Sequence, residues 1–116
     1  MTARKEAAIR HAKERIARIH ESIGDIEHLS SGTLLKRMKR CGNPRCACAK
    51  DPDARHGPYY EWSYMKDGRL RHRTLSPEQA KLMRRAIANH RKVKRLLQLW
   101  ETYTLRLIEL TVPGRR

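Results

Sequence analysis

The stretch YYEWSYMKDGRLRHRTLSPEQ, residues 59–79, decides the fold because a strand pair and the start of a helix meet in it. Aromatic side chains alternate through its first half at Tyr60, Trp62 and Tyr64. The residues KDG at 66–68 supply turn chemistry, and beyond them every second residue is an arginine: Arg69, Arg71 and Arg73. Alternation on both sides of a short turn predicts a β-hairpin.

The residues SPEQ at 76–79 predict the start of a helix. Ser76 is a favoured N-cap, Pro77 suits the first helical position, and Gln79 can complete a capping box with Ser76. Apolar residues then recur at spacings of four and three from Leu82 to Leu110, which is one face of a helix. We therefore expect a helix over residues 77–112.

A second helix is expected over residues 3–29. Six small or apolar residues repeat there at spacings of three and four: Ile9, Ala12, Ile16, Ile19, Ile23 and Ile26. Gly24 disfavours a helix by about 1 kcal/mol relative to alanine, but the pattern continues past it. Two amphipathic helices of this kind are expected to pack as an antiparallel coiled-coil hairpin. Part of the longer seam, around Trp100–Leu110, then has no partner in the chain, which suggests a homodimer.

The segment TLLKRMKRC, residues 33–41, fits either a third strand or a short helix, and we favour the strand. The predicted fold is therefore a single α+β domain over residues 1–116. It has a long N-terminal helix, a small antiparallel β-meander over residues 33–75 with a Cys-rich loop that resembles a zinc knuckle, and a long C-terminal helix.

All three cysteines of the chain lie in the loop CGNPRCACAK, residues 41–50. An odd number of clustered thiols fits a disulfide framework poorly and favours reduced cysteines. Cys41, Cys46 and Cys48 with His56 form a Cys₃His set of the kind that binds zinc tetrahedrally. His72 is the main rival as fourth ligand, and three unpaired surface thiols are the alternative reading.

The positive charge is concentrated in the middle of the chain. The net charge is +15, and residues 34–95 hold 18 Lys or Arg against five Asp or Glu, an excess of 13. Such an excess predicts binding to a polyanion, DNA or RNA, through phosphate contacts. The candidate contact residues surround the cysteine loop, follow the hairpin and occupy an arc of about 120° on the C-terminal helix. They are Lys36, Arg37, Lys39, Arg40, Arg45, Arg55, Tyr59, Arg69, Arg71, Arg73, Lys81, Arg84, Arg85, Arg91, Lys92 and Arg95.

The aromatic residues of the hairpin divide into two groups. Tyr60, Trp62 and Tyr64 share one face and are expected to pack against the helices. Tyr59 is out of phase with them, so it is the better candidate for contact with a ligand.

Several classes of protein are disfavoured by the sequence. No apolar run approaches a membrane span, and the N-terminus has no signal-like apolar region, so a cytoplasmic protein, nucleoid-associated if it binds DNA, is expected. The zinc deaminase pattern is missing because His56 is followed by Gly57 and Pro58. No HExxH, Walker or GxSxG motif occurs, so no catalytic residues are assigned and no enzyme is expected.

Residues 32–100 resemble a family of small bacterial and archaeal proteins of unknown function. The resemblance rests on a Gly-x-Leu start, on CGNPRCACA at 41–49, on HGPYY at 56–60 and on a following tryptophan. Members of that family are often encoded beside transposases. The resemblance therefore implies an accessory role in a mobile-element system and a protein partner from it.

These observations favour a zinc-stabilised, non-enzymatic nucleic-acid-binding protein. One alternative is a coiled-coil adaptor whose basic face binds an acidic protein partner. Another, with little support in the sequence, is a small nuclease or toxin that uses His56, His72 or Tyr59.

Overall fold

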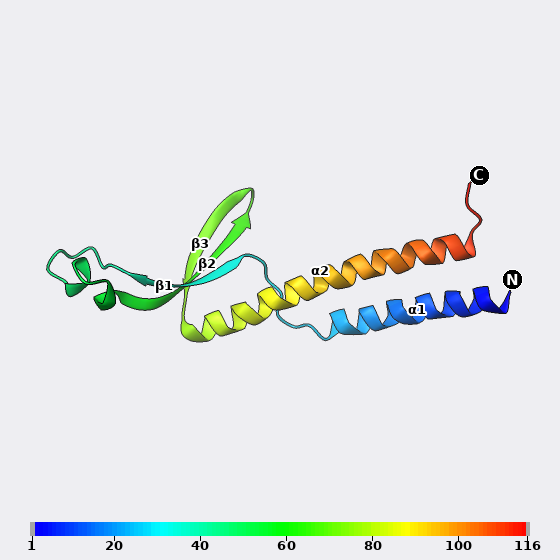
Figure 1. Cartoon of the computed structure of the whole chain (residues 1–116), viewed down its shortest axis with the longest axis horizontal. Helices are drawn as coiled ribbons and strands as arrows, with labels where there is room; N and C mark the ends of the chain where they lie inside the picture. Colours follow the sequence, from blue (N-terminus) through cyan, green and yellow to red (C-terminus); the bar gives the residue numbers. More distant parts are fainter. Residues whose placement is uncertain (1, 116) are drawn as a thin grey trace. The chain divides into compact units, whose positions relative to one another are not determined.

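The computed structural model describes residues 2–115 and contains two long helices and a three-stranded antiparallel sheet (Figure 1). The elements in chain order are α1 (Ala3–Gly24), β1 (Thr33–Lys39), the 3-10 turns η1 (Ala47–Ala49) and η2 (Pro52–Ala54), β2 (His56–Lys66), β3 (Arg69–Leu75) and α2 (Pro77–Thr111). The α+β class is therefore confirmed, and so is the strand assignment for the segment before the cysteines.

The chain divides into two compact units. One consists of the residues up to Glu27 together with those from Asn89 onward, and the other is His28–Ala88. Helix α2 contributes to both units. The expectation of one domain stays a prediction.

In the helical unit, α1 and the C-terminal part of α2 lie side by side and run in opposite directions (Figure 1). The His20 ring lies 4.3 Å from that of Trp100, measured between ring centroids. Nearer the chain ends, Arg15 Nε donates a hydrogen bond of 3.3 Å to the Tyr103 hydroxyl. Ala12 and Ile19 of the predicted seam are buried. The two helices are therefore in contact, while the meeting of their apolar faces as a coiled coil stays a prediction.

Helix α1 ends at Gly24, so the predicted range of 3–29 was too long. The Asp25 N–H donates to the Glu21 carbonyl, and the Ile26 N–H donates to the Ile23 carbonyl and closes a tighter turn. Glycine is a poor helix former, and its cost was sufficient here to end the helix despite the apolar spacing on both sides. Ile26 is half-buried although it lies beyond the helix.

Helix α2 begins as predicted, at a reciprocal capping box. The Gln79 N–H donates to Ser76 Oγ over 3.1 Å, and the Ser76 N–H donates to Gln79 Oε1 over 2.9 Å. Two backbone donors that the first helical turn would leave unpaired are thereby satisfied. Leu82, predicted in the apolar seam, is instead 44% exposed, and Ala80 and Ile87 are buried.

The sheet is a meander with strand order β1-β2-β3. Asp67 and Gly68 both have positive φ, 54° and 75°, as a two-residue hairpin turn of the primed type requires. This turn fixes the register between β2 and β3, in which Lys66 pairs with Arg69, Tyr64 with Arg71 and Trp62 with Arg73.

The segment before β1 is tied to the middle of the sheet through Trp62. The Trp62 indole N–H donates to the Ser31 carbonyl over 2.8 Å. Next to it, Gly32 has a φ of 106°, and a Cβ at this position would collide with the Ser63 carbonyl oxygen and lie 2.7 Å from Trp62 Nε1. Only glycine combines this backbone conformation with such a close approach.

Within residues 2–115, no helix has the length and apolar character that crossing a membrane requires.

Gly32→Ala is expected to destabilise the protein by roughly 2–4 kcal/mol, because it adds overpacking to backbone strain. Gly68→Ala is the matched control. Its φ is also positive, but nothing lies within 4 Å of the added Cβ, so strain alone should cost about 1 kcal/mol. Urea unfolding of both variants measures the difference. Equal losses of stability would contradict the close packing assigned to Gly32.

Candidate metal centre and basic surface

The pairing of β1 with β2 brings the two ends of the cysteine loop together. Lys39 near the end of β1 is paired with His56 at the start of β2, after a register shift that leaves Met38 without a partner residue. Cys41 follows β1 by two residues. The sheet therefore places a thiol and an imidazole, 15 positions apart in sequence, at the base of one loop.

Short turns carry the other two thiols back toward this base. Asn43 Oδ1 accepts from the Arg45 N–H, and the Asn43 carbonyl accepts from the Cys46 N–H, both over 3.0 Å. The chain then enters η1, in which the Ala49 N–H donates to the Cys46 carbonyl. Asparagine favours such a turn because its side-chain oxygen can accept from a backbone N–H two residues further on.

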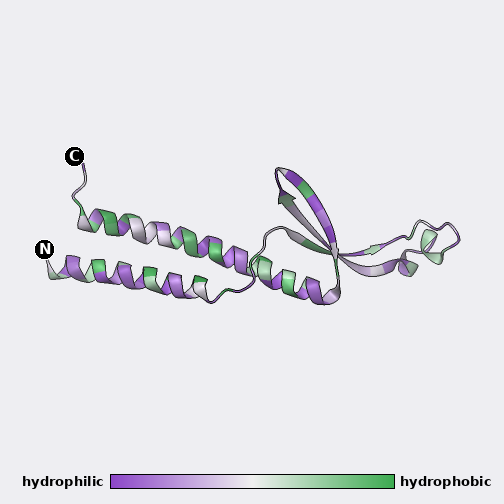
Figure 2. Ribbon diagram, turned by 180° about the vertical axis from the view of Figure 1, so that it is seen from behind, coloured by the Kyte–Doolittle hydropathy of each residue, from purple (hydrophilic) through white to green (hydrophobic). Residues whose placement is uncertain are grey.

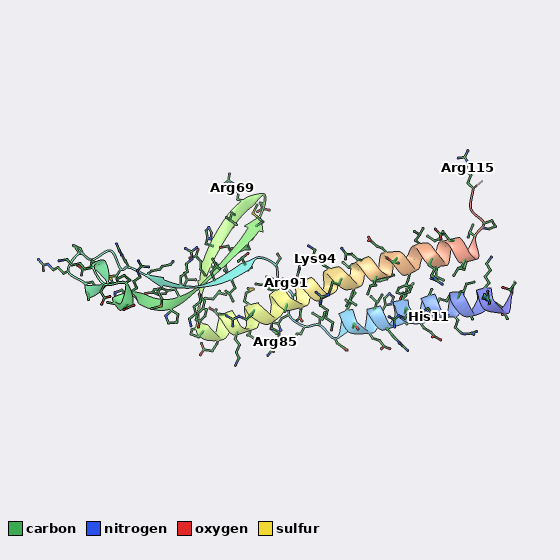
Figure 3. All side chains as sticks on the ribbon, in the orientation of Figure 1. His11, Arg69, Arg85, Arg91, Lys94 and Arg115 are labelled. Atoms are coloured by element: carbon green, nitrogen blue, oxygen red, sulfur yellow. The ribbon has the colours of Figure 1, made fainter. Side chains whose placement is uncertain are left out.

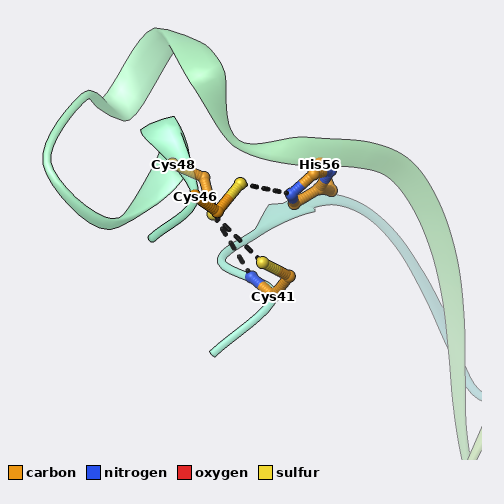
Figure 4. A group of neighbouring side chains, drawn as sticks. All are labelled: Cys41, Cys46, Cys48 and His56. Atoms are coloured by element: carbon orange, nitrogen blue, oxygen red, sulfur yellow. Dashed lines mark hydrogen bonds between the residues drawn. The ribbon is translucent and has the colours of Figure 1, made fainter. Parts of the chain in front are cut away.

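The four predicted ligand side chains converge (Figure 4). Their ligand atoms all lie within 4.8 Å of one another. Cys41 Sγ and Cys48 Sγ are 3.5 Å apart, and Cys46 Sγ is 3.2 Å from His56 Nε2. Ligand atoms around a tetrahedral zinc ion, at bond lengths of about 2.0–2.3 Å, lie roughly 3.3–3.8 Å apart. The cluster could therefore hold a metal ion with little rearrangement.

The buried residue of the cysteine loop is one of the four candidate metal ligands. Among residues 40–55, Cys48 alone is buried, with 1% of its surface exposed. Cys46 and His56 are half-buried and Cys41 is exposed. The loop has no apolar core of its own, so hydrophobic burial contributes little to keeping it closed.

The thiols differ in their ease of ionisation. Hydrogen bonds from the N–H and the side chain of Cys48, and from the Cys41 side chain, lower the pKa of Cys46 and so favour the Cys46 thiolate. The pKa of Cys48 is raised instead. The Cys41 N–H donates to the Cys48 sulfur over 3.4 Å and opposes this change, but burial and the neighbouring side chains of Cys46 and Cys41 outweigh it. A bound cation would favour the thiolate form of all three cysteines.

His72, the rival ligand, is engaged elsewhere. Its Nδ1 lies 2.8 Å from Ser63 Oγ and 3.3 Å from Glu61 Oε1. The Glu61 carboxylate also contacts Lys39 Nζ at 3.2 Å and Arg37 Nε at 3.9 Å. Lys39 above all, with Arg37 and His72, holds the pKa of Glu61 below its usual range despite partial burial. Glu61 therefore neutralises part of the charge of the two predicted phosphate contacts Arg37 and Lys39.

The predicted nucleic-acid contacts are all exposed, but they fall into separate groups. Arg40, Arg45 and Arg55 belong to the cysteine loop. Tyr59 shares the Glu61 face of the sheet with Arg37, and Lys39 Nζ lies 6.0 Å from its ring centroid. Lys36 lies on β1, opposite Tyr60. The remaining contacts lie on β3 and α2, and Figure 3 labels three of the arginines among them, Arg69, Arg85 and Arg91.

The aromatic and the basic residues of the hairpin share a face of the sheet, which was not expected from the sequence. Residues paired in an antiparallel ladder project from the same face. The register therefore puts Tyr64 and Trp62 on the face of Arg71 and Arg73. The Trp62 and Tyr64 rings are stacked, with centroids 3.9 Å apart and planes inclined by 15°.

Comparison with known proteins identifies a family. Residues 6–85 match the model of a family described as a domain of unknown function (DUF6788). The matched segment begins within α1 and ends within the first turns of α2. No curated protein and no solved structure matches the chain.

The cluster predicts equimolar binding of Co²⁺ with the visible absorption of a tetrahedral thiolate site. His56→Ala should weaken Co²⁺ binding by at least about tenfold, since even outer-shell partners cost that much, and should change the spectrum as nitrogen is lost from the site. His72→Ala is the control and should leave affinity and spectrum unchanged. Metal titration followed by absorption spectroscopy measures both. The ligand assignment is wrong if His72→Ala has the larger effect.

Proposed function

Because the chain belongs to the DUF6788 family, whose description assigns no function, we propose a function from the chemistry of its sites: a zinc-stabilised, non-enzymatic nucleic-acid-binding accessory protein. The observation that carries the proposal is the placement of a Cys₃His cluster and a row of unpaired cations on the same small sheet. The zinc would stabilise the loop, and the cationic side chains would bind the phosphates of the nucleic acid.

Zinc is the proposed metal because of the donor set. Three thiolates and one imidazole match structural zinc sites, in which all four positions are occupied by protein side chains. Calcium and magnesium prefer oxygen ligands, which this cluster does not offer among its four residues. Zinc would link the end of β1, η1 and the start of β2, and so hold the loop arginines in place.

Phosphate binding is supported by the positive charge of the sheet face on which the three arginines of β3 lie. Figure 2 shows β3 as mostly hydrophilic, and Arg69, Arg71 and Arg73 are exposed on it. The paired positions add Lys66 on β2, and Lys36 of β1 lies opposite Tyr60 on the same face. No carboxylate occurs at the positions on these strands that share this face. Such a surface favours a polyanion through release of its counterions.

The helical unit would serve as the scaffold of the protein. We propose that α1 and α2 pack there as an antiparallel coiled-coil hairpin. Leu97, Leu105 and Ile108 are 46%, 58% and 55% exposed on α2, and they border a shallow apolar hollow with Trp100 and Thr104. This exposed apolar surface is consistent with the homodimer suggested by the sequence.

Binding to nucleic acid should weaken steeply with salt, because each phosphate contact releases counterions. Substituting glutamine for Arg71 and Arg73 should reduce the slope of log K against log salt concentration by about 0.7–0.9 for each phosphate that is no longer neutralised. Arg37→Gln with Lys39→Gln is the matched control, with the same decrease in charge. It should change the slope less, since Glu61 already neutralises part of that charge.

The measurement is a titration of labelled single- and double-stranded oligonucleotides at several salt concentrations. Binding without salt dependence, or no binding at low salt, would rule out the proposed function. Recovery of a nuclease-resistant acidic protein partner in place of nucleic acid would support the adaptor alternative instead.

A further inference from the structure

Trp62 and Tyr64, the stacked aromatic pair of β2, lie on the basic face of the sheet. Their neighbours on β3 are Arg73 and Arg71, and Tyr60 lies two positions before Trp62 on the same face. Surfaces that bind single-stranded nucleic acid combine two kinds of side chain: cations, which hold the phosphates, and aromatic rings, which stack on the bases. The two sets were expected to have different roles, but the register combines them.

The aromatic pair is held in a fixed position. Trp62 is anchored by its hydrogen bond to the Ser31 carbonyl and by the close approach of Gly32. Tyr64 stacks on Trp62 with nearly parallel planes. Because the Trp62 ring cannot turn without breaking that bond, it offers the Tyr64 ring a fixed surface on which to stack. Little conformational entropy would then be lost when a further ring stacks on Tyr64.

Trp62 covers one face of the Tyr64 ring, and among residues 2–115 no further ring or cation is stacked on Tyr64, whose side chain is half-buried. Its pairing partner Arg71 is exposed, as are Lys66 and Arg69 at the adjacent pair toward the turn. A flat, uncharged ring on Tyr64 would therefore have three cations nearby for the phosphates that flank it.

Acidic groups of the hairpin do not compete for this face. Glu61 projects from the opposite face, where it contacts Lys39, Arg37 and His72. Asp67 lies in the turn, outside the paired positions. The charge next to the aromatic pair is thus positive and unpaired, and an anionic ligand is favoured over a cationic or neutral one.

We propose that this face of the sheet binds single-stranded nucleic acid, with a base stacked on Tyr64 and its flanking phosphates held by Arg71, Arg69 and Lys66. A duplex keeps its bases stacked in its interior and would offer this face its phosphates alone. The inference rests on the proposed nucleic-acid-binding function and adds to it a preference for unpaired bases.

The test compares ligands that differ in the presence of bases, in their sugar and in the number of strands. Wild-type protein with zinc bound is titrated with oligothymidylate, with oligouridylate, with an abasic oligonucleotide of equal length, and with a duplex. The expected result is roughly 5- to 150-fold tighter binding to the oligomers with bases than to the abasic one, which is the effect of one stacked base. The thymidylate and uridylate arms tell DNA from RNA as the preferred strand.

Variants then locate the stacking residue. Tyr64→Ala should remove this preference and leave the abasic affinity unchanged, whereas Tyr64→Phe should retain it. Tyr59→Ala, on the other face of the sheet, tests the stacking candidate that the sequence favoured, and the preference should survive it. The comparison of abasic with normal strands needs no variant, so it stands even if Tyr64→Ala fails to fold.

The outcomes distinguish a failure of base stacking from a failure of nucleic-acid binding as a whole. Equal affinity for abasic, single-stranded and duplex ligands, with salt dependence retained, would overturn the stacking inference and leave phosphate binding in place. No affinity for any of the four ligands would overturn the proposed function as well. A preference for bases that Tyr59→Ala removes and Tyr64→Ala does not would overturn the assignment to Tyr64.

Discussion

The convergence of three thiols and one imidazole on a single point is the interaction on which the rest of the sheet unit depends. The loop between β1 and β2 has a single buried side chain, the Cys48 thiol, and is otherwise held by turn hydrogen bonds. Burial above all, with the neighbouring thiols, raises the pKa of Cys48 and so disfavours its thiolate. A structure of this kind is stable when a cation satisfies the sulfurs, and structural zinc sites derive their folding free energy from that exchange.

The metal cluster and the basic face use the same strand. β2 begins at His56, in the cluster, and continues through Trp62 and Tyr64 to the turn at Asp67 and Gly68. Anything that fixes the start of β2 against β1 also fixes the register of the aromatic pair, because a shift by one residue would turn every side chain to the opposite face. The four residues of the Cys₃His cluster and the proposed nucleic-acid surface are therefore linked through the backbone.

Much of this architecture could be predicted from local sequence. The capping box at Ser76 and Gln79 fixed the start of α2, and the cysteine spacing with His56 identified the cluster, because both signals involve residues close together in the chain. The end of α1 was missed since the cost of Gly24 competed with an apolar spacing that continued to Ile26. The Glu61 ion pairs could not be predicted, because they join residues of three strands. The shared face of Tyr64 and Arg71 could have been predicted: a two-residue turn at Asp67 and Gly68 already implies that pairing.

The central claim, that a metal ion holds the cysteine loop closed, is tested most directly by amide hydrogen exchange with and without a chelator. The relevant amides are those of Cys41, which donates to the Cys48 sulfur, and of Cys46 and Ala49 in the turns of the loop. The β2–β3 hairpin amides serve as the internal reference. We predict that chelation speeds exchange in the loop far more than in the hairpin, and that returning zinc restores protection. Loop amides that stay equally protected after complete removal of metal would contradict the account.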